Sequence, residues 1–146
     1  MTASTTDLAS IKQSGTPEEI LPNRRSFPMA ASTSIPSGCI VGLNVSGNAG
    51  NAEGATFTNV VGVCERAVDN SLGGATAKQV TAIRGVFAGY ATSGTAVDKT
   101  KIGSKIYAAD NQTLTLTSTS NAFAGYVDDI KDGVPYYSIA VHVQGS

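Results

Sequence analysis

Few residues of the chain have side chains that can carry out acid–base, nucleophilic or metal chemistry. The single histidine, His142, alternates with the apolar positions of the last predicted strand, so an exposed or interface position is expected for it rather than a catalytic one. The two cysteines, Cys39 and Cys64, are far apart in sequence, and with one histidine they lack the ligand spacing of a His/Cys metal site. These residues predict no metal centre.

Three aspartates, Asp128, Asp129 and Asp132, gather near a predicted turn and are the remaining candidates for a cation site. They do not match the ligand pattern of a calcium-binding loop, so a solvated hairpin end is expected. The glycine-rich segments lack the spacing of a phosphate-binding loop, and no Gly-x-Ser-x-Gly motif marks a nucleophilic serine. The sequence therefore predicts no enzyme activity, no catalytic residue and no cofactor.

The overall composition limits the classes of partner. A chain of 146 residues is expected to form one domain, and 41% hydrophobic residues suffice for a core. Lys and Arg (10) nearly cancel Asp and Glu (11), which predicts no nucleic-acid-binding surface. No apolar run approaches the roughly 20 residues of a membrane span, and no signal peptide is expected. Cys39 and Cys64, inside apolar strand patterns, are expected to be buried, reduced thiols.

The elements that position these residues are β-strands, and the centre of the predicted fold is a pair of them, 61–68 and 80–90. Both segments alternate and are rich in β-branched residues. Between them, Asp, Asn and Gly tolerate the positive φ angles that a chain reversal needs. Strict alternation places Val61 and Val63 on one face of the first strand and Cys64 on the other.

Other segments repeat this pattern along the rest of the chain. Further strands are expected at 39–45, 55–57, 102–108, 113–117, 122–130 and 134–143, with loops at 46–54 and 91–99. In 113–117 the leucines face inward and the threonines outward, and Lys131-Asp132-Gly133 forms a tight hairpin turn. Seven to nine short strands and no long helix predict an all-β fold, a small antiparallel β-barrel or sandwich.

Residues 1–37 are rich in Ser, Thr and Pro and show no strand periodicity. They predict an extended N-terminal arm, followed by a β-barrel domain at 38–146. The arm has more apolar content than a solvating tail needs, so we expect it to become ordered on a partner surface; a disordered tail is the alternative. Deleting residues 1–36 should then leave a folded barrel. The residues expected to bind the partner are Ile20, Leu21, Arg24, Arg25, Phe27 and Met29.

Arg84 stands in the middle of a predicted strand. If it faces inward, it needs a carboxylate partner, and Glu65 and Asp69 across the chain reversal are the candidates. A structural ion pair is the expected role of these residues.

Three stretches of the chain carry a family resemblance. They are Gly62-Val63-x-x-x-Ala67-Val68-Asp69-Asn70-Ser71 with the later Arg84-Gly85-Val86-Phe87, then Gly103 to Leu114 (GSKIYAADNQTL), and Ala124 to Val134 (AGYVDDIKDGV). In order and spacing they resemble the small capsid decoration (cement) proteins of tailed bacteriophages, over about residues 39–143. Asn111 stands where that family has an aspartate, a change that a turn tolerates. The N-terminal 37 residues lie outside the resemblance.

The resemblance implies a β-barrel-like module that binds the outer surface of the expanded capsid lattice and stabilises it by bridging neighbouring subunits. The expected partners are the major capsid protein and further copies of the chain, as a trimer first, because capsid lattices offer local threefold sites, and as a dimer second. The expected location is the virion surface, after synthesis in the host cytoplasm. Arg24 and Arg25 would meet acidic capsid groups.

Another virion surface module, such as a fibre or tail domain that binds a host glycan, is the alternative function. Sugars commonly stack on aromatic side chains, and the chain has five tyrosines and no tryptophan. A small β-barrel enzyme is disfavoured because no acid–base constellation is present.

Overall fold

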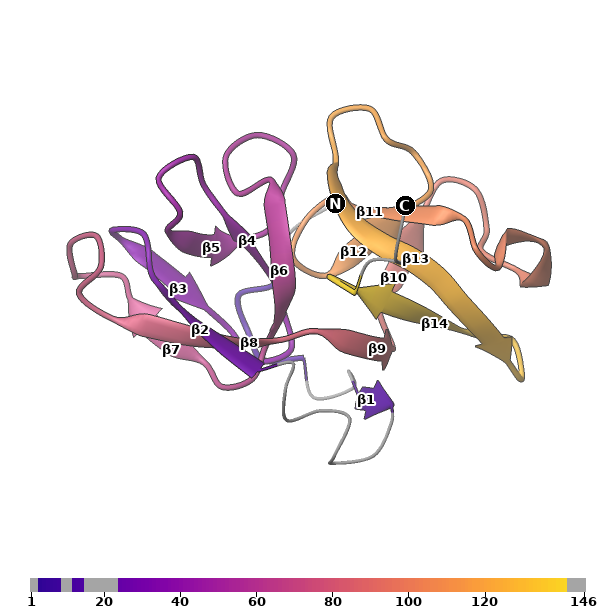
Figure 1. The fold of residues 1–146 in the computed structure, drawn as a ribbon, viewed down its shortest axis with the longest axis horizontal. Helices are drawn as coiled ribbons and strands as arrows, with labels where there is room; N and C mark the ends of the chain where they lie inside the picture. The colour runs from indigo at the N-terminus through magenta and orange to yellow at the C-terminus, as the bar shows by residue number, and fades with distance from the viewer. Residues whose placement is uncertain (1–2, 9–11, 15–23, 142–146) are drawn as a thin grey trace.

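The computed structural model describes residues 3–8, 12–14 and 24–141, and these are almost entirely β-structure (Figure 1). Their one helical element is the 3-10 turn η2 (Lys99–Lys101), which the Asp98 side chain caps. The strands pair antiparallel apart from one parallel pair, so the predicted all-β fold is confirmed. In the described residues, no helix is long and apolar enough to cross a membrane.

The C-terminal half of the chain forms most of a seven-stranded sheet, called sheet A. Its strands in spatial order are β1 (Lys12–Ser14), β9 (Gly85–Ala88), β14 (Val134–Ile139), β13 (Ala122–Lys131), β11 (Lys105–Ala108), β12 (Thr113–Thr115) and β10 (Ala91–Ser93). The β13–β14 hairpin turns through Asp132 and Gly133, with φ values of 51° and 78°. The tight turn predicted there is confirmed.

The N-terminal half forms a five-stranded sheet, called sheet B, and a separate strand pair. Sheet B has the order β2 (Arg24–Pro28), β8 (Gln79–Ile83), β6 (Asn59–Cys64), β4 (Ile40–Leu43) and β5 (Ala49–Asn51), and β3 (Thr33–Ile35) pairs with β7 (Val68–Asn70). The chain passes from sheet B to sheet A where β8 leads into β9 (Figure 1). The short strands β5 and β10 fall inside segments predicted as loops.

Two core clusters hold these layers together. The first lies between the sheets, where Ile40 and Val63 of sheet B meet Phe87 and Tyr137 of sheet A. The second lies on the other side of sheet B and includes Ile35 of β3. The strands β4 and β6 therefore bury both faces, and sheet B is the middle layer of the molecule.

A β-bulge changes the facing of β6 from the predicted alternation. The pairing of β4 with β6 shifts register beside Gly62, so Val60 and Val63 both face the first cluster while Val61 and Cys64 face the second. Gly62 has φ +151°, and a Cβ there would lie 2.8 Å from the carbonyl oxygen of Ile83. The prediction that Val61 and Val63 share a face is wrong because the bulge adds one residue to β6.

The strand β12 also differs from the prediction. Thr113, Leu114 and Thr115 are all buried, while Leu116 is partly buried and packs against the first cluster. Thr113 and Thr115 are therefore not on a solvent face, whereas Thr117 is exposed as predicted.

Residues 24–37 belong to the folded body rather than to an arm. The strand β2 pairs along its whole length with β8, from Arg24 with Ile83 to Pro28 with Gln79. The strand β3 pairs with β7, and its Ile35 is fully buried. The predicted boundary between an arm and a barrel at residue 37 is therefore wrong for these residues, because their strand partners lie 33 to 59 residues away in the sequence.

Candidate interaction surfaces

Side chains able to donate protons or bind metals are scattered over the described part of the chain. Its His, Cys, Asp and Glu residues include no group of three or more placed to hold a metal ion. Asp128 and Asp132 are exposed, and Asp129 accepts a hydrogen bond from the amide of Ile130. His142 lies outside the described residues. The exposed side chains of the described residues form the candidate interaction surfaces.

The two cysteines are neighbouring free thiols in the second core cluster. The Cys64 amide donates a hydrogen bond to the Cys39 carbonyl at 2.8 Å, and the two residues are 2% and 0% exposed. Burial raises the pKa of Cys39 to about 11 and that of Cys64 to about 12. The prediction of buried, unbridged cysteines is confirmed, and these thiols are poor nucleophiles at neutral pH.

Stability is expected to fall in alkaline solution because buried thiols and phenols stay neutral in the folded state. Burial raises the pKa of Tyr137 to about 12 and that of Tyr90 well above 10. In the unfolded chain the thiols ionise near 9.0 and the phenols near 10.0. Above pH 9 the unfolded state therefore binds fewer protons than the native state, and the free energy of unfolding decreases with pH.

By this linkage each thiol accounts for a loss on the order of 1 kcal/mol between pH 8 and pH 10. Urea unfolding at pH 8, 9 and 10 measures the loss. Cys64→Ala serves as the control, since it should lower stability at pH 8 but show a shallower decline above pH 9. A free energy of unfolding that stays constant up to pH 10 would contradict the expectation.

The predicted partner-binding residues of the N-terminal region separate into three groups. Phe27 and Met29 are 8% and 0% exposed and lie in the second core cluster, so their predicted role as surface anchors is wrong. Ile20 and Leu21 lie outside the described residues. Arg24 and Arg25 are exposed on β2, at the edge of sheet B.

The two arginines of β2 have different surroundings. Arg24 forms an ion pair with Glu65. The guanidinium of Arg25 lies 5.1 Å from the centre of the Phe27 ring, a cation–π contact. Arg25 thus remains without a carboxylate among the described residues, and it is the basic group that this edge offers to a partner.

Glu65, a predicted partner of Arg84, has a different partner in the structure. In the described residues Glu65 is paired with Arg24, and no ion pair joins Arg84 to Glu65 or Asp69. Asp69 is exposed, and hydrogen bonds from the hydroxyl and amide of Ser71 lower its pKa. The alternation of residues 61–90 could not indicate Arg24 as the partner of Glu65, because Arg24 lies on β2, outside that segment.

The segment 3–8 is fastened across the junction of the two sheets by Asn111. The Asn111 side chain is fully buried; it accepts a hydrogen bond from the Ser4 amide at 2.7 Å and donates one to the Ser4 carbonyl at 3.0 Å. The Leu8 amide donates to the Ser37 carbonyl at 2.7 Å, and the Leu8 side chain packs against both core clusters. We call residues 3–8 the N-terminal clasp.

A row of aromatic side chains lies on the outer face of sheet A. Tyr107, Phe123 and Tyr126 contact one another edge to face, with ring centres 5.8 Å and 5.6 Å apart. The Lys105 ammonium lies 6.0 Å from the Phe123 ring centre. These rings are partly exposed, and such a platform suits stacking against a flat apolar ligand face.

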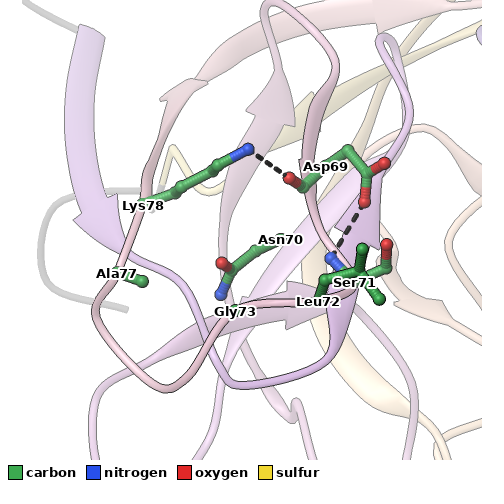
Figure 2. Close-up of a pocket in the computed structure, with 7 residues that line it drawn as sticks. All are labelled: Asp69, Asn70, Ser71, Leu72, Gly73, Ala77 and Lys78. Carbon is green, nitrogen blue, oxygen red and sulfur yellow. Dashed lines mark hydrogen bonds between the residues drawn. The ribbon is translucent and has the colours of Figure 1, made fainter.

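The loop between β7 and β8 is an exposed feature with several hydrogen bonds of its own (Figure 2). A hollow of about 360 Å³ is lined by Asp69, Asn70, Leu72 and Lys78 among others. The Lys78 ammonium donates to the Asp69 carbonyl at 2.6 Å, which closes the loop at its base. Leu72 is fully exposed. A leucine between polar turn residues and Gly73-Gly74 was the one sequence signal for this surface.

The sequence of the chain matches no protein-family model and no curated protein, and its fold matches no solved structure.

Proposed function

We propose that this protein is a capsid decoration (cement) protein of a tailed bacteriophage. The observation that carries the proposal is where the family-like segments lie. Residues 84–87, 103–114 and 124–134 fall in β9, β11, β12, β13 and the start of β14, and these five strands are consecutive in sheet A. The remaining stretch, 62–71, falls in β6 of sheet B and in β7. Most of the resemblance thus follows one continuous sheet.

The proposed action is stabilisation of the expanded capsid by selective binding. A protein that bridges neighbouring capsid subunits in the expanded lattice alone shifts the equilibrium toward that lattice. A homo-oligomer, with a trimer as the first expectation and a dimer as the second, gains avidity because its copies bind together. A modest contact area per copy then suffices for stable binding to the capsid.

The part of β2 exposed at the edge of sheet B is the described surface that we propose for the capsid contact. Of the predicted contact residues, Arg24 and Arg25 are the ones that the structure places at the surface. Arg24 is largely neutralised by Glu65, so Arg25 carries most of the attraction to acidic capsid groups. Electrostatic contacts of this kind weaken with added salt.

Co-sedimentation tests the proposal, with capsids of the parent phage that lack this protein. Saturable binding to expanded shells and none to unexpanded procapsids is the expected result, together with a higher melting temperature of the decorated shell. The variant Arg24→Ala/Arg25→Ala is expected to bind at least about tenfold more weakly. Lys99→Ala/Lys101→Ala, which removes the same charge beside sheet A, is the control and should bind normally.

Absence of binding to both shells would overturn the proposal. The aromatic row of Tyr107, Phe123 and Tyr126 would then favour the alternative, a virion surface module that stacks a host glycan on these rings. A glycan-array screen of the wild-type protein, repeated with Tyr107→Ala, identifies that outcome.

A further inference from the structure

The β7–β8 loop is anchored by hydrogen bonds from a buried side chain, that of Asn70. The Asn70 side chain is 1% exposed and donates to the carbonyls of Ala30, at 2.9 Å, and Gly74, at 3.1 Å. A Cβ at Gly73 would lie 2.0 Å from the Asn70 oxygen, so glycine is required there. The Ser32 amide adds a bond to the Gly73 carbonyl at 3.0 Å.

This ordered loop displays an apolar side chain in full contact with solvent. Leu72 has a relative exposure of 102% and stands at the rim of the 360 Å³ hollow. Figure 2 shows Leu72 beside Ser71, with Asp69 and Lys78 at the base of the same loop. Because the loop backbone is already anchored, a partner that covers Leu72 pays for ordering the side chain but not the loop. The loop therefore combines a preorganised apolar knob with an adjacent hollow.

The loop carries two charges of opposite sign, on Asp69 and Lys78, and both residues line the hollow. Asp69 is exposed, and its hydrogen bonds from Ser71 favour the ionised form. Lys78 is also exposed and uses one donor on the Asp69 carbonyl, which leaves two donors of its ammonium for a partner. A twofold interface uses the same patch on both copies, so a patch that carries both charges, a knob and a hollow has the features that such an interface needs.

We propose that two copies of the protein associate through their β7–β8 loops around a twofold axis. Leu72 of each copy enters the hollow of the other, and Asp69 of each faces Lys78 of the other. The proposal deepens the homo-oligomer part of the proposed function and rests on that part; of the two expected oligomers, it selects the dimer. A twofold axis is favoured because knob and hollow lie side by side on a single loop, so two facing loops fill both hollows at once.

A contact built on one loop from each copy is small. Stable protein interfaces bury at least about 1,200 Å² in total, so the dimer is expected to dissociate in the micromolar range, about 10–500 µM. Binding of several copies to one surface would strengthen it by avidity.

Sedimentation equilibrium of the full chain over this concentration range tests the proposal without any capsid. The wild-type protein should show a monomer–dimer equilibrium, and Leu72→Asp should weaken it at least about tenfold, since the change acts twice in each dimer. Val45→Asp is the matched control, because Val45 is equally exposed on the β4–β5 turn; it should leave the dissociation constant unchanged. A monomeric wild-type protein, or equal weakening by both variants, would overturn the proposal.

Charge exchange separates a lost contact from a damaged loop. Asp69→Lys places two lysines in facing positions, and Lys78→Asp places two aspartates there, so each variant alone should be monomeric. An equimolar mixture restores both opposite-charge pairs and should form a heterodimer at least about tenfold more tightly than either variant associates alone. Misfolded loops would not regain association on mixing, so a mixture that stays monomeric overturns the twofold arrangement.

The outcomes also separate this proposal from the capsid function. If the wild-type protein is monomeric but still co-sediments with expanded shells, the loop contact fails and the decoration function stands. If Leu72→Asp abolishes shell binding while the wild-type protein is monomeric, the loop faces the capsid instead of a second copy, and the dimer is overturned.

Discussion

A chain that lacks residues 1–36 is expected not to fold cooperatively. The deletion removes β2 from the edge of sheet B, β3 from its pairing with β7, and the large buried side chains Phe27, Met29 and Ile35. Truncation of one such side chain to alanine costs about 2–5 kcal/mol. Together these losses reach the whole stability of a typical domain, about 5–15 kcal/mol. Far-UV circular dichroism during urea titration measures the result.

Point variants show that the effect comes from the core. Met29→Ala should lower the free energy of unfolding by about 2–5 kcal/mol, whereas Val45→Ala, at a fully exposed position, should change it by less than about 0.5 kcal/mol. A truncated chain that unfolds cooperatively at the wild-type midpoint would restore the interpretation of residues 1–37 as an independent arm.

The second large effect is expected for Asn111→Asp. The Asn111 amide donates hydrogen bonds to two acceptors, the Ser4 carbonyl and the Asn51 side-chain oxygen at 2.9 Å. A carboxylate at this fully buried position would face both oxygens without a proton to give. Leaving buried acceptors unpaired costs about 1–3 kcal/mol, and a buried charge costs more. The variant should therefore be destabilised by about 2–4 kcal/mol at pH 7.

The pH dependence of this variant has a definite sign. Burial raises the pKa of the new carboxyl above its unfolded value of about 3.9, so the protonated form, which can donate again, is favoured in the folded state. The destabilisation should shrink as the pH falls from 7 to 4.5, which thermal melts measure.

A matched change elsewhere provides the control. Asn44→Asp should be nearly neutral, because the Asn44 side-chain oxygen only accepts bonds, from the amides of Ser46 and Asn48. Equal effects of the two substitutions would show that the N-terminal clasp does not depend on Asn111.

The all-β class, the hairpin turn at 131–133 and the buried thiols were predictable because they depend on local patterns: alternation, turn residues and apolar surroundings. The role of Phe27 and Met29 was not, since β2 is short, contains a basic pair and a proline, and is defined by a partner more than 50 residues away. The prediction that Val61 and Val63 share a face was wrong because a bulge depends on how two strands pair, and the sequence of one strand does not show it.

The candidate surfaces were predictable to a smaller degree. An exposed leucine in a polar turn is visible in the sequence, but the order of its loop depends on Asn70 reaching the carbonyl of Ala30, forty residues away. Asn111 looked like an ordinary turn residue, and its contact with Ser4 follows from the tertiary fold alone. Long-range polar contacts of this kind leave no periodic trace.

The N-terminal clasp also sets the order in which the molecule can be completed during synthesis. Ser4 leaves the ribosome first, yet its partner Asn111 follows 107 residues later, and β1 waits for β9 more than 70 residues downstream. At about 5–20 residues per second, the Ser4 end of the clasp stays unpaired for roughly 5–20 s. Such distant pairing slows folding. Sheet B has all five of its strands once β8 is made, whereas sheet A requires β14 and the clasp requires Asn111, so each copy reaches its native surface only after these later residues have been made.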